Sequence, residues 1–175
     1  MEVDGAEPKS RVLSLEVRPS VVGFAVFDVA GQLLDCGRCT HRVPMEALSH
    51  TSASRISALI ERHQPSIVVT RQRTVRMVQA RERINTILRV VRGETKKGNI
   101  EFRKVSSVAV LSLFASRGGA SKYERAELIA RQFPQLSWKL PRRRKAWNRE
   151  DSRMVIFDAA TTALTFLNQG HSTPH

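Results

Sequence analysis

The sequence predicts an α/β protein whose mixed five-stranded sheet carries helices on both faces. Near the start, two apolar strands joined by a tight turn lead into a third strand, which predicts an antiparallel meander. A short continuous apolar run at 66–70 is typical of a central strand covered on both sides. Segments with helical spacing then separate the later strands, which favours two parallel strands added to the meander.

The meander occupies residues 11–17, 21–29 and 32–40, with Ala30 and Gly31 forming the second turn. The first strand is apolar apart from a single acid, Glu16. An acid inside a buried strand is costly unless a metal ion or hydrogen-bond donors compensate it. Glu16 is therefore a candidate functional residue.

The second half of the chain alternates helices and strands and then becomes helical. Ser121 and Glu124 have capping-box spacing, and Gly93 and Asn148 are a predicted C-cap and N-cap. The predicted elements are a helix at 43–63 ended by Pro65, a strand at 66–70, a helix at 74–92, a loop at 94–99, a strand at 100–105, and helices at 106–116, 121–133 and 149–168.

The chain of 175 residues is long enough for one domain, predicted at 11–168, with flexible tails at 1–10 and 169–175. Hydrophobic residues make up 41%, which favours a packed fold over disorder. No run of about 18 apolar residues is present, and the acidic N-terminus lacks the apolar core of a secretory signal. These features predict a cytoplasmic protein.

The charge points to a polyanionic partner. Lysine and arginine number 29 against 16 acids, which gives a net charge of +13. A basic cluster at 139–145 lies between the two tryptophans, Trp138 and Trp147. These tryptophans either stack on exposed bases or anchor a surface loop on the core. The predicted nucleic-acid-binding residues are Arg73, Arg76, Lys96, Lys97, Arg142, Arg143, Arg144, Lys145 and Trp147.

Cys36 and Cys39 form a single C-x-x-C pair. One pair without a second pair or a suitable histidine is a weak zinc signal. The two residues lie within a predicted strand, where their side chains would face opposite sides. We expect two free thiols.

Several segments, in the same order along the chain, resemble the RuvC Holliday-junction resolvases of the RNase H-like superfamily. They are the opening hairpin with Gly23-Phe-Ala-Val, the third-strand segment 31–37, the glycine-containing loop and helix start at 117–124, and the closing-helix segment 157–164. The resemblance covers about residues 11–168 and implies the RNase H-like fold.

In that family, four carboxylates hold two divalent ions that cut DNA. The resemblance implies that Glu16 keeps the first carboxylate and Asp158 the third, so these two residues are the candidate catalytic and metal-binding pair. The second position falls on Arg71, or on Thr70 if the register slips by one, and the fourth falls on Thr161. An arginine beside a divalent ion is repulsive, so a standard two-metal site is not expected.

Two other acids, Glu150 and Asp151, are possible substitute ligands, although both suit the first turn of the predicted last helix. Alternatively, Arg71 or Arg18 neutralises the two remaining carboxylates, because a guanidinium can replace the charge of an ion. We expect Arg71 to converge with Glu16 and Asp158 at the C-terminal edge of the central strands.

The leading functional hypothesis is a RuvC-like domain that binds structured nucleic acid, branched or duplex DNA or else RNA, without standard two-metal cleavage. It requires no cofactor. One alternative is an active endonuclease of the resolvase type that uses Glu16 and Asp158 with Mg²⁺ or Mn²⁺. Another is a basic interaction module of a larger nucleoprotein machine. The family resemblance also implies a homodimer.

Overall fold

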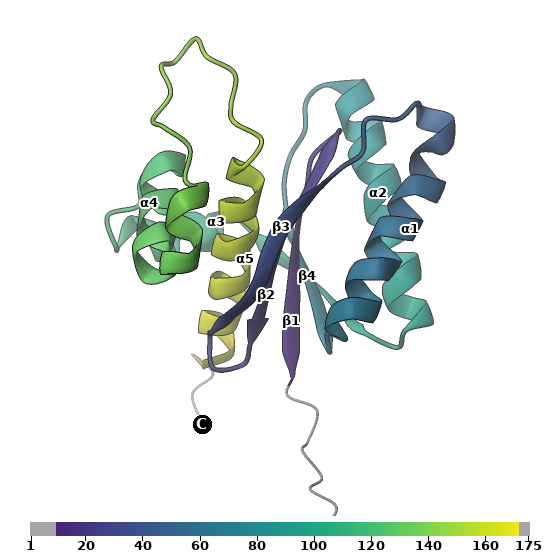
Figure 1. Ribbon diagram of the computed structural model, residues 1–175, viewed down its shortest axis with the longest axis horizontal. Helices are drawn as coiled ribbons and strands as arrows, with labels where there is room; N and C mark the ends of the chain where they lie inside the picture. Colours follow the sequence, from purple (N-terminus) through teal and green to yellow (C-terminus); the bar gives the residue numbers. More distant parts are fainter. Residues whose placement is uncertain (1–9, 172–175) are drawn as a thin grey trace, which may run out of the picture.

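The computed structural model describes residues 10–171, and it confirms the predicted fold class. Five strands form one sheet in the order β3-β2-β1-β4-β5 (Figure 1). Residues 1–9 and 172–175 of the predicted tails lie outside the described residues, and the last helix continues past the expected boundary at 168 as far as His171. The elements are β1 (Arg11–Val17), β2 (Val21–Asp28), β3 (Leu33–Thr40), α1 (Met45–His63), β4 (Ile67–Gln72), α2 (Val78–Lys97), β5 (Glu101–Ser106), α3 (Ser107–Ala115), α4 (Lys122–Gln132), a 3-10 helix η1 (Pro134–Lys139) and α5 (Met154–His171).

Strand pairing follows the predicted plan. β1 pairs antiparallel with β2, and β2 pairs antiparallel with β3, which completes the meander. On its other side β1 pairs in parallel with β4, and β4 pairs in parallel with β5. The C-terminal ends of β1, β4 and β5 therefore lie at the same edge of the sheet.

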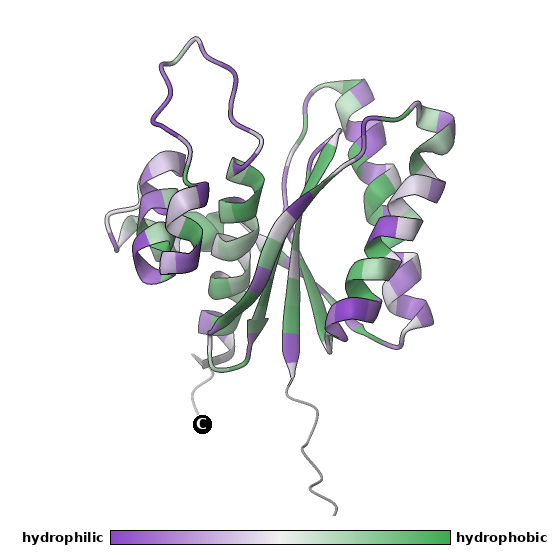
Figure 2. Cartoon of the chain, viewed as in Figure 1, coloured by the Kyte–Doolittle hydropathy of each residue, from purple (hydrophilic) through white to green (hydrophobic). Residues whose placement is uncertain are grey.

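The helices form one layer on each face of the sheet. α3, α4 and α5 lie on one side, and α1 and α2 lie on the other (Figure 1). Each layer encloses its own apolar core, and the buried surfaces of α5 and of the strands are mostly apolar (Figure 2). Along β1, Val12 belongs to the core beneath α5, and Leu13 belongs to the core beneath α1 and α2. This alternation places Glu16 on the α5 side.

The prediction that Gly93 caps a helix is wrong, because α2 runs through the expected loop at 94–99 as far as Lys97. Gly93 has open space where a side chain would be, and Thr95, two residues before the end of α2, is buried. The helix ends instead at Gly98, and Asn99 follows with a φ of 51°.

The predicted start of the last helix is also wrong. α5 begins at Met154 rather than near 149, so Asn148 does not cap it. Asp151 organises a turn instead, because its carboxylate accepts hydrogen bonds from the backbone and side chain of Arg153. Residues 140–153 form an extended loop that projects beyond the ends of the neighbouring helices (Figure 1).

The cysteine prediction is confirmed. Both thiols are free, and they face opposite sides of β3, with Cys36 packed against the α5 core and Cys39 against the α1–α2 core. Burial is the main reason that the pKa of each thiol is raised. Among the described residues, no helix is both long and apolar enough to cross a bilayer.

Candidate functional site

Glu16 and Asp158 are brought together by a close contact between a strand and a helix. Glu16 lies opposite Gly23 in the β1–β2 register, on the face that α5 covers. A Cβ atom at Gly23 would lie 2.4 Å from the carbonyl oxygen of Val155, so only glycine allows α5 to approach this closely. Asp158 follows Val155 by nearly one helical turn and therefore points toward the same place.

Two arginines bridge the pair of carboxylates. Arg18 donates from Nε to Glu16 Oε1 at 3.0 Å and from Nη2 to Asp158 Oδ2 at 2.7 Å. Arg73 lies 2.8 Å from Glu16 Oε1 through Nε and 3.5 Å from Asp158 Oδ2 through Nη2. Each guanidinium group thus links Glu16 on β1 to Asp158 on α5.

Lys122 and Glu150 complete the cluster. The ammonium group of Lys122 lies 2.9 Å from Asp158 Oδ2 and also contacts Glu150. Glu150 accepts a longer bond from Arg18 Nη1 at 3.4 Å. We define Glu16, Arg18, Arg73, Lys122, Glu150 and Asp158 as the charge cluster.

Local structure fixes where each cation sits. Arg18 lies two residues after Glu16, on the same face of the chain, and the turn that follows it is held by Arg83 of α2, whose Nε donates to the carbonyl of Pro19 at 2.8 Å. Lys122 is the first residue of α4, where the predicted capping box between Ser121 and Glu124 is confirmed.

The side chain of the buried Arg125 holds the loop before α4 in place. Its Nη1 donates to the carbonyl oxygens of Gly119 and Ala120 at 3.3 and 3.0 Å. Gly118 turns the chain with a φ of 82°. These contacts fix the start of α4 and therefore the position of Lys122 in the charge cluster.

Two of the three acids, Glu16 and Asp158, form the floor of the cluster, whereas the third acid, Glu150, and the cations lie above them. The side chains of Glu16 and Asp158 are 1% and 3% exposed, whereas those of Arg18, Arg73 and Lys122 are 24–29% exposed. One floor atom, Glu16 Oε2, has no hydrogen-bond partner among the described residues. The site therefore presents three cations and one carboxylate, that of Glu150, to solvent.

The two buried acids respond to this environment in opposite directions. Burial, followed by the nearby charge of Asp158, raises the pKa of Glu16 despite the opposing effect of Arg73 and Arg18. Burial also acts to raise the pKa of Asp158, but Lys122, Arg73 and Arg18 outweigh it and hold that pKa below its usual value. Asp158 is thus the acid that remains ionised.

This difference predicts how stability depends on pH. Because its pKa is raised in the folded protein, Glu16 keeps a proton that the unfolded chain loses above a pH of about 4.5, so its contribution to the free energy of unfolding falls as the pH rises. Glu16→Gln removes this contribution. We expect the stability of the variant relative to the unaltered protein to increase between that pH and neutrality. Asp158 does not contribute in this window, because its pKa is lowered.

Urea unfolding of both proteins across the window measures this difference directly. A stability difference that stays constant with pH would contradict a raised pKa for Glu16.

The expected pairing of Arg71 with Glu16 is wrong. Arg71 Nε donates to Ser107 Oγ at 3.2 Å, at the start of α3, and Arg18 and Arg73 make the contacts that were expected of it. Arg71 is still near enough for its charge to lower the pKa of Glu16. The alternative that Arg18 neutralises the carboxylates agrees with the observed contacts.

The other positions implied by the resemblance are also accounted for. The hydroxyl of Thr161 donates to the backbone carbonyl of Asp158 at 2.9 Å inside α5 and provides no charge. Glu150 reaches the charge cluster, but Asp151 pairs with Arg153. Neither acid lies in the first turn of α5, because the helix begins at Met154.

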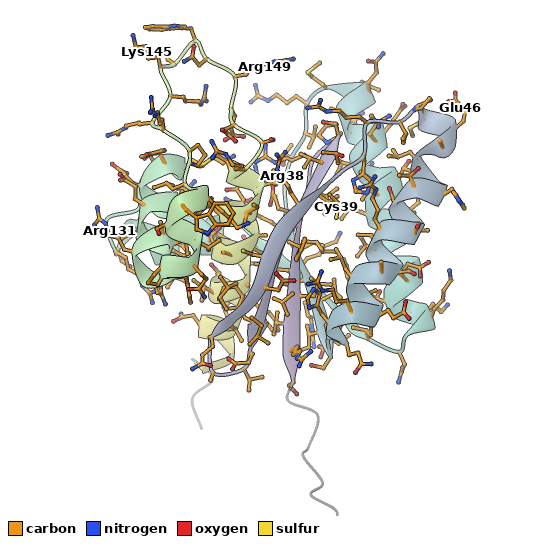
Figure 3. The ribbon with its side chains drawn as sticks, in the orientation of Figure 1. Arg38, Cys39, Glu46, Arg131, Lys145 and Arg149 are labelled. Carbon is orange, nitrogen blue, oxygen red and sulfur yellow. The ribbon has the colours of Figure 1, made fainter. Side chains whose placement is uncertain are left out.

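Most of the predicted nucleic-acid-binding residues lie on two exposed segments. Arg142, Arg143, Arg144, Lys145 and Trp147 belong to the extended loop at 140–153, whose outer part carries the labelled Lys145 and Arg149 (Figure 3). Lys96 and Lys97 lie at the end of α2, where Lys97 is paired with Glu94. Arg76 lies just before α2, and Arg73 belongs to the charge cluster.

The alternative that the tryptophans anchor the loop on the core is wrong. Trp138 and Trp147 are 74% and 79% exposed. Each ring is covered by a neighbouring lysine, with the ammonium nitrogen 4.2 Å from the centroid of Trp138 and 5.3 Å from that of Trp147. Tyr123 holds the base of the loop instead, because its hydroxyl donates to the carbonyl of Pro141 at 3.1 Å.

The charge cluster does not fit a two-metal centre. Glu16 Oε1, Asp158 Oδ2 and both oxygens of Glu150 already contact cationic nitrogen atoms. Within residues 10–171, no group of three His, Cys, Asp or Glu side chains is placed to hold a metal ion. A divalent ion about 4 Å from any one of these cations would be repelled by several kcal/mol at an effective dielectric constant of about 20.

Sequence reasoning did not identify Lys122 as a site residue, and it assigned Arg73 only to nucleic-acid binding. Arg18 carries a readable signal, since it lies two residues after Glu16 in an extended segment. The capping box fixed the helical position of Lys122 but not its distance from α5, which depends on the packing of the two helices.

Neither models of known protein families nor curated protein sequences match the chain. Solved structures do. Thermus thermophilus RuvC in complex with a Holliday junction substrate matches with a TM-score of 0.69 and 16% identity, over 94% of this chain and 97% of that chain. A second Thermus thermophilus RuvC structure matches with a TM-score of 0.68 and 15% identity, over 94% of this chain and 99% of that one.

The yeast mitochondrial Holliday junction resolvase Ydc2 matches with a TM-score of 0.69 and 15% identity, over 91% of this chain and 78% of that chain. The similarity thus extends through the meander, the parallel strands and the helices of both layers. The chain has the RNase H-like fold in the arrangement found in RuvC-type Holliday junction resolvases.

Proposed function

We propose that this protein binds branched nucleic acid, in the first place four-way DNA junctions, and does not cleave it by a two-metal mechanism. The observation that carries the proposal is the charge cluster. Arg18, Arg73 and Lys122 contact the two buried carboxylates that resemblance to the resolvases would assign to metal ions. Cleavage of that kind requires two ions at this position, and the side-chain cations contact one oxygen atom of each buried carboxylate and supply positive charge where the ions would sit.

The surface charge supports nucleic acid as the partner. The chain carries a net charge of +13, and the loop at 140–153 places several arginines beside an exposed tryptophan. Arginine side chains bind phosphates in a bidentate manner, and an exposed indole ring can stack on an unpaired base. One of the structures of similar fold is a resolvase bound to a Holliday junction, which makes a four-way junction the first ligand to test.

Binding and cleavage are tested separately. We expect a labelled four-way junction to bind with micromolar or better affinity at low salt and to dissociate as the salt concentration rises, because phosphate contacts release counterions. A linear duplex of the same length is the control ligand, with which the affinity for the junction is compared. If neither DNA nor RNA binds, the chain is better explained as a protein-interaction module.

The junction should also remain intact with magnesium or manganese. We expect millimolar concentrations of either metal to leave the thermal unfolding midpoint unchanged, because a ligand that binds the folded state would raise it. Cleavage products, or a clear metal-dependent increase in that midpoint, would contradict the non-catalytic proposal.

One observation favours a second candidate function, a metal-dependent nuclease. Glu150 lies in the charge cluster, so three acids would become available if Lys122, Arg18 and Arg73 moved aside. Junction cleavage that is abolished by both Glu16→Gln and Asp158→Asn would establish this alternative. The homodimer that the resemblance implies remains a prediction, which sedimentation measurements of the free protein can test.

A further inference from the structure

The cations of the charge cluster retain hydrogen-bonding capacity beyond their contacts with the acids. A guanidinium has five N–H groups and an ammonium has three. The contacts of Arg73 use Nε and Nη2, which leaves Nη1 without an acceptor among the described residues. Lys122 uses its ammonium group on two acids, Asp158 and Glu150, so one N–H remains.

Positive charge exceeds negative charge around this site. The three cations of the charge cluster face three acids, and the charges of Arg71 and Arg125 also act on the buried carboxylates. An incoming anion therefore meets net positive charge, because the cations outnumber the carboxylates with which they pair.

Two grooves border the charge cluster, and each is lined by a different part of it. The first has a volume of about 710 Å³ and runs beneath the 140–153 loop, with Lys122, Glu150 and Arg142 among its lining residues. The second has a volume of about 560 Å³ and is lined by Arg18, Arg73 and the start of α2. An extended strand lying in both grooves would pass over the exposed nitrogen atoms of the cluster.

We propose that Arg18, Arg73 and Lys122, which all contact Asp158, bind one backbone phosphodiester of the nucleic acid at the charge cluster, between the two grooves. These cations are side chains and not metal ions, so they neutralise the phosphate without activating a water molecule as a nucleophile. The contact therefore positions the strand and breaks no bond. The inference rests on the proposed function and adds to it the chemical group that is bound and the residues that bind it.

The test removes the phosphate charge and the protein charge one at a time and then together. A neutral methylphosphonate is placed at each position near the branch point of the junction in turn. For the unaltered protein, we expect one position at which this change weakens binding by about tenfold or more, because it removes charge-assisted hydrogen bonds. In Arg73→Gln, the same change should cost less than about threefold, because phosphate and arginine act as a coupled pair.

Arg131→Gln is the matched control, since it removes one arginine from the outer side of α4, away from the loop at 140–153 (Figure 3). It should retain the full methylphosphonate penalty. Lys122→Met provides a second variant if Arg73→Gln folds poorly, and it should show the same loss of coupling.

The outcomes separate the two proposals. Failure of the unaltered protein to bind the unmodified junction would overturn the proposed function. Binding with no sensitive phosphate position, or with a penalty that is equal in Arg73→Gln and the unaltered protein, would overturn only the phosphate assignment.

Discussion

Replacing Arg142 and Arg144 with alanine should sharply weaken junction binding and reduce its salt dependence. Each phosphate contact contributes about 0.9 units to the slope of the logarithm of the binding constant against the logarithm of salt concentration, so two contacts account for up to about 1.8 units. Arg143 is retained because its guanidinium lies over the ring of Tyr123, 5.6 Å from the centroid, and helps to hold the base of the loop.

The matched control removes the same charge elsewhere. Arg62→Ala combined with Arg131→Ala alters two exposed arginines on α1 and α4, outside both grooves. Anisotropy titrations at several salt concentrations measure both slopes. If the two double variants have equal slopes, the 140–153 loop does not contact phosphates, and the arginine-rich α2 becomes the next surface to test.

Replacing Gly23 with alanine should lower the free energy of unfolding by about 3 kcal/mol, at the upper end of the usual cost of overpacking a core. The added methyl group would meet the backbone of Val155 at 2.4 Å, and the backbone of a buried helix cannot move aside as a flexible side chain can. Any relief requires α5 to shift away from β2. Since α5 carries Asp158, we also expect the variant to weaken the contact between Asp158 and Arg18.

Gly93 provides the internal comparison for this variant. It lies inside α2 with open space where a Cβ would be, so Gly93→Ala should raise stability by up to about 1 kcal/mol. Urea unfolding of the two variants measures both changes. A Gly23→Ala protein as stable as the unaltered protein would contradict the close approach of α5 to β2.

The fold could be predicted because its signals are local. Alternating apolar residues, the turn at Gly31 and the capping box at Ser121 each specify their element without knowledge of its neighbours. Two of the boundary errors have local causes as well. A glycine inside α2 was interpreted as a cap, and Asp151 forms a turn three residues before α5 begins.

Part of the site could be predicted as well, although mainly from resemblance to the resolvases. Glu16 and Asp158 were identified from their places in the opening hairpin and the closing helix, and Arg18 was one of two alternatives for neutralising them. The other cations could not be assigned by position, since Arg71 lies within β4 and bonds to α3, whereas Arg73 lies beyond the strand end and reaches back to Glu16. The direction of a side chain that lies beyond the end of a strand depends on the surrounding packing, and sequence spacing does not predict it.

Because Arg18, Arg73 and Lys122 are part of the polypeptide, the positive charge at this position is stoichiometric from the moment the chain folds. It cannot be diluted, chelated or exchanged for another ion. Retention of a bound strand at this position should therefore need no divalent ion and should survive EDTA, although it still weakens as the salt concentration rises. Where an exchangeable ion would have to be loaded before the strand could be held, this arrangement supplies the charge with the fold itself.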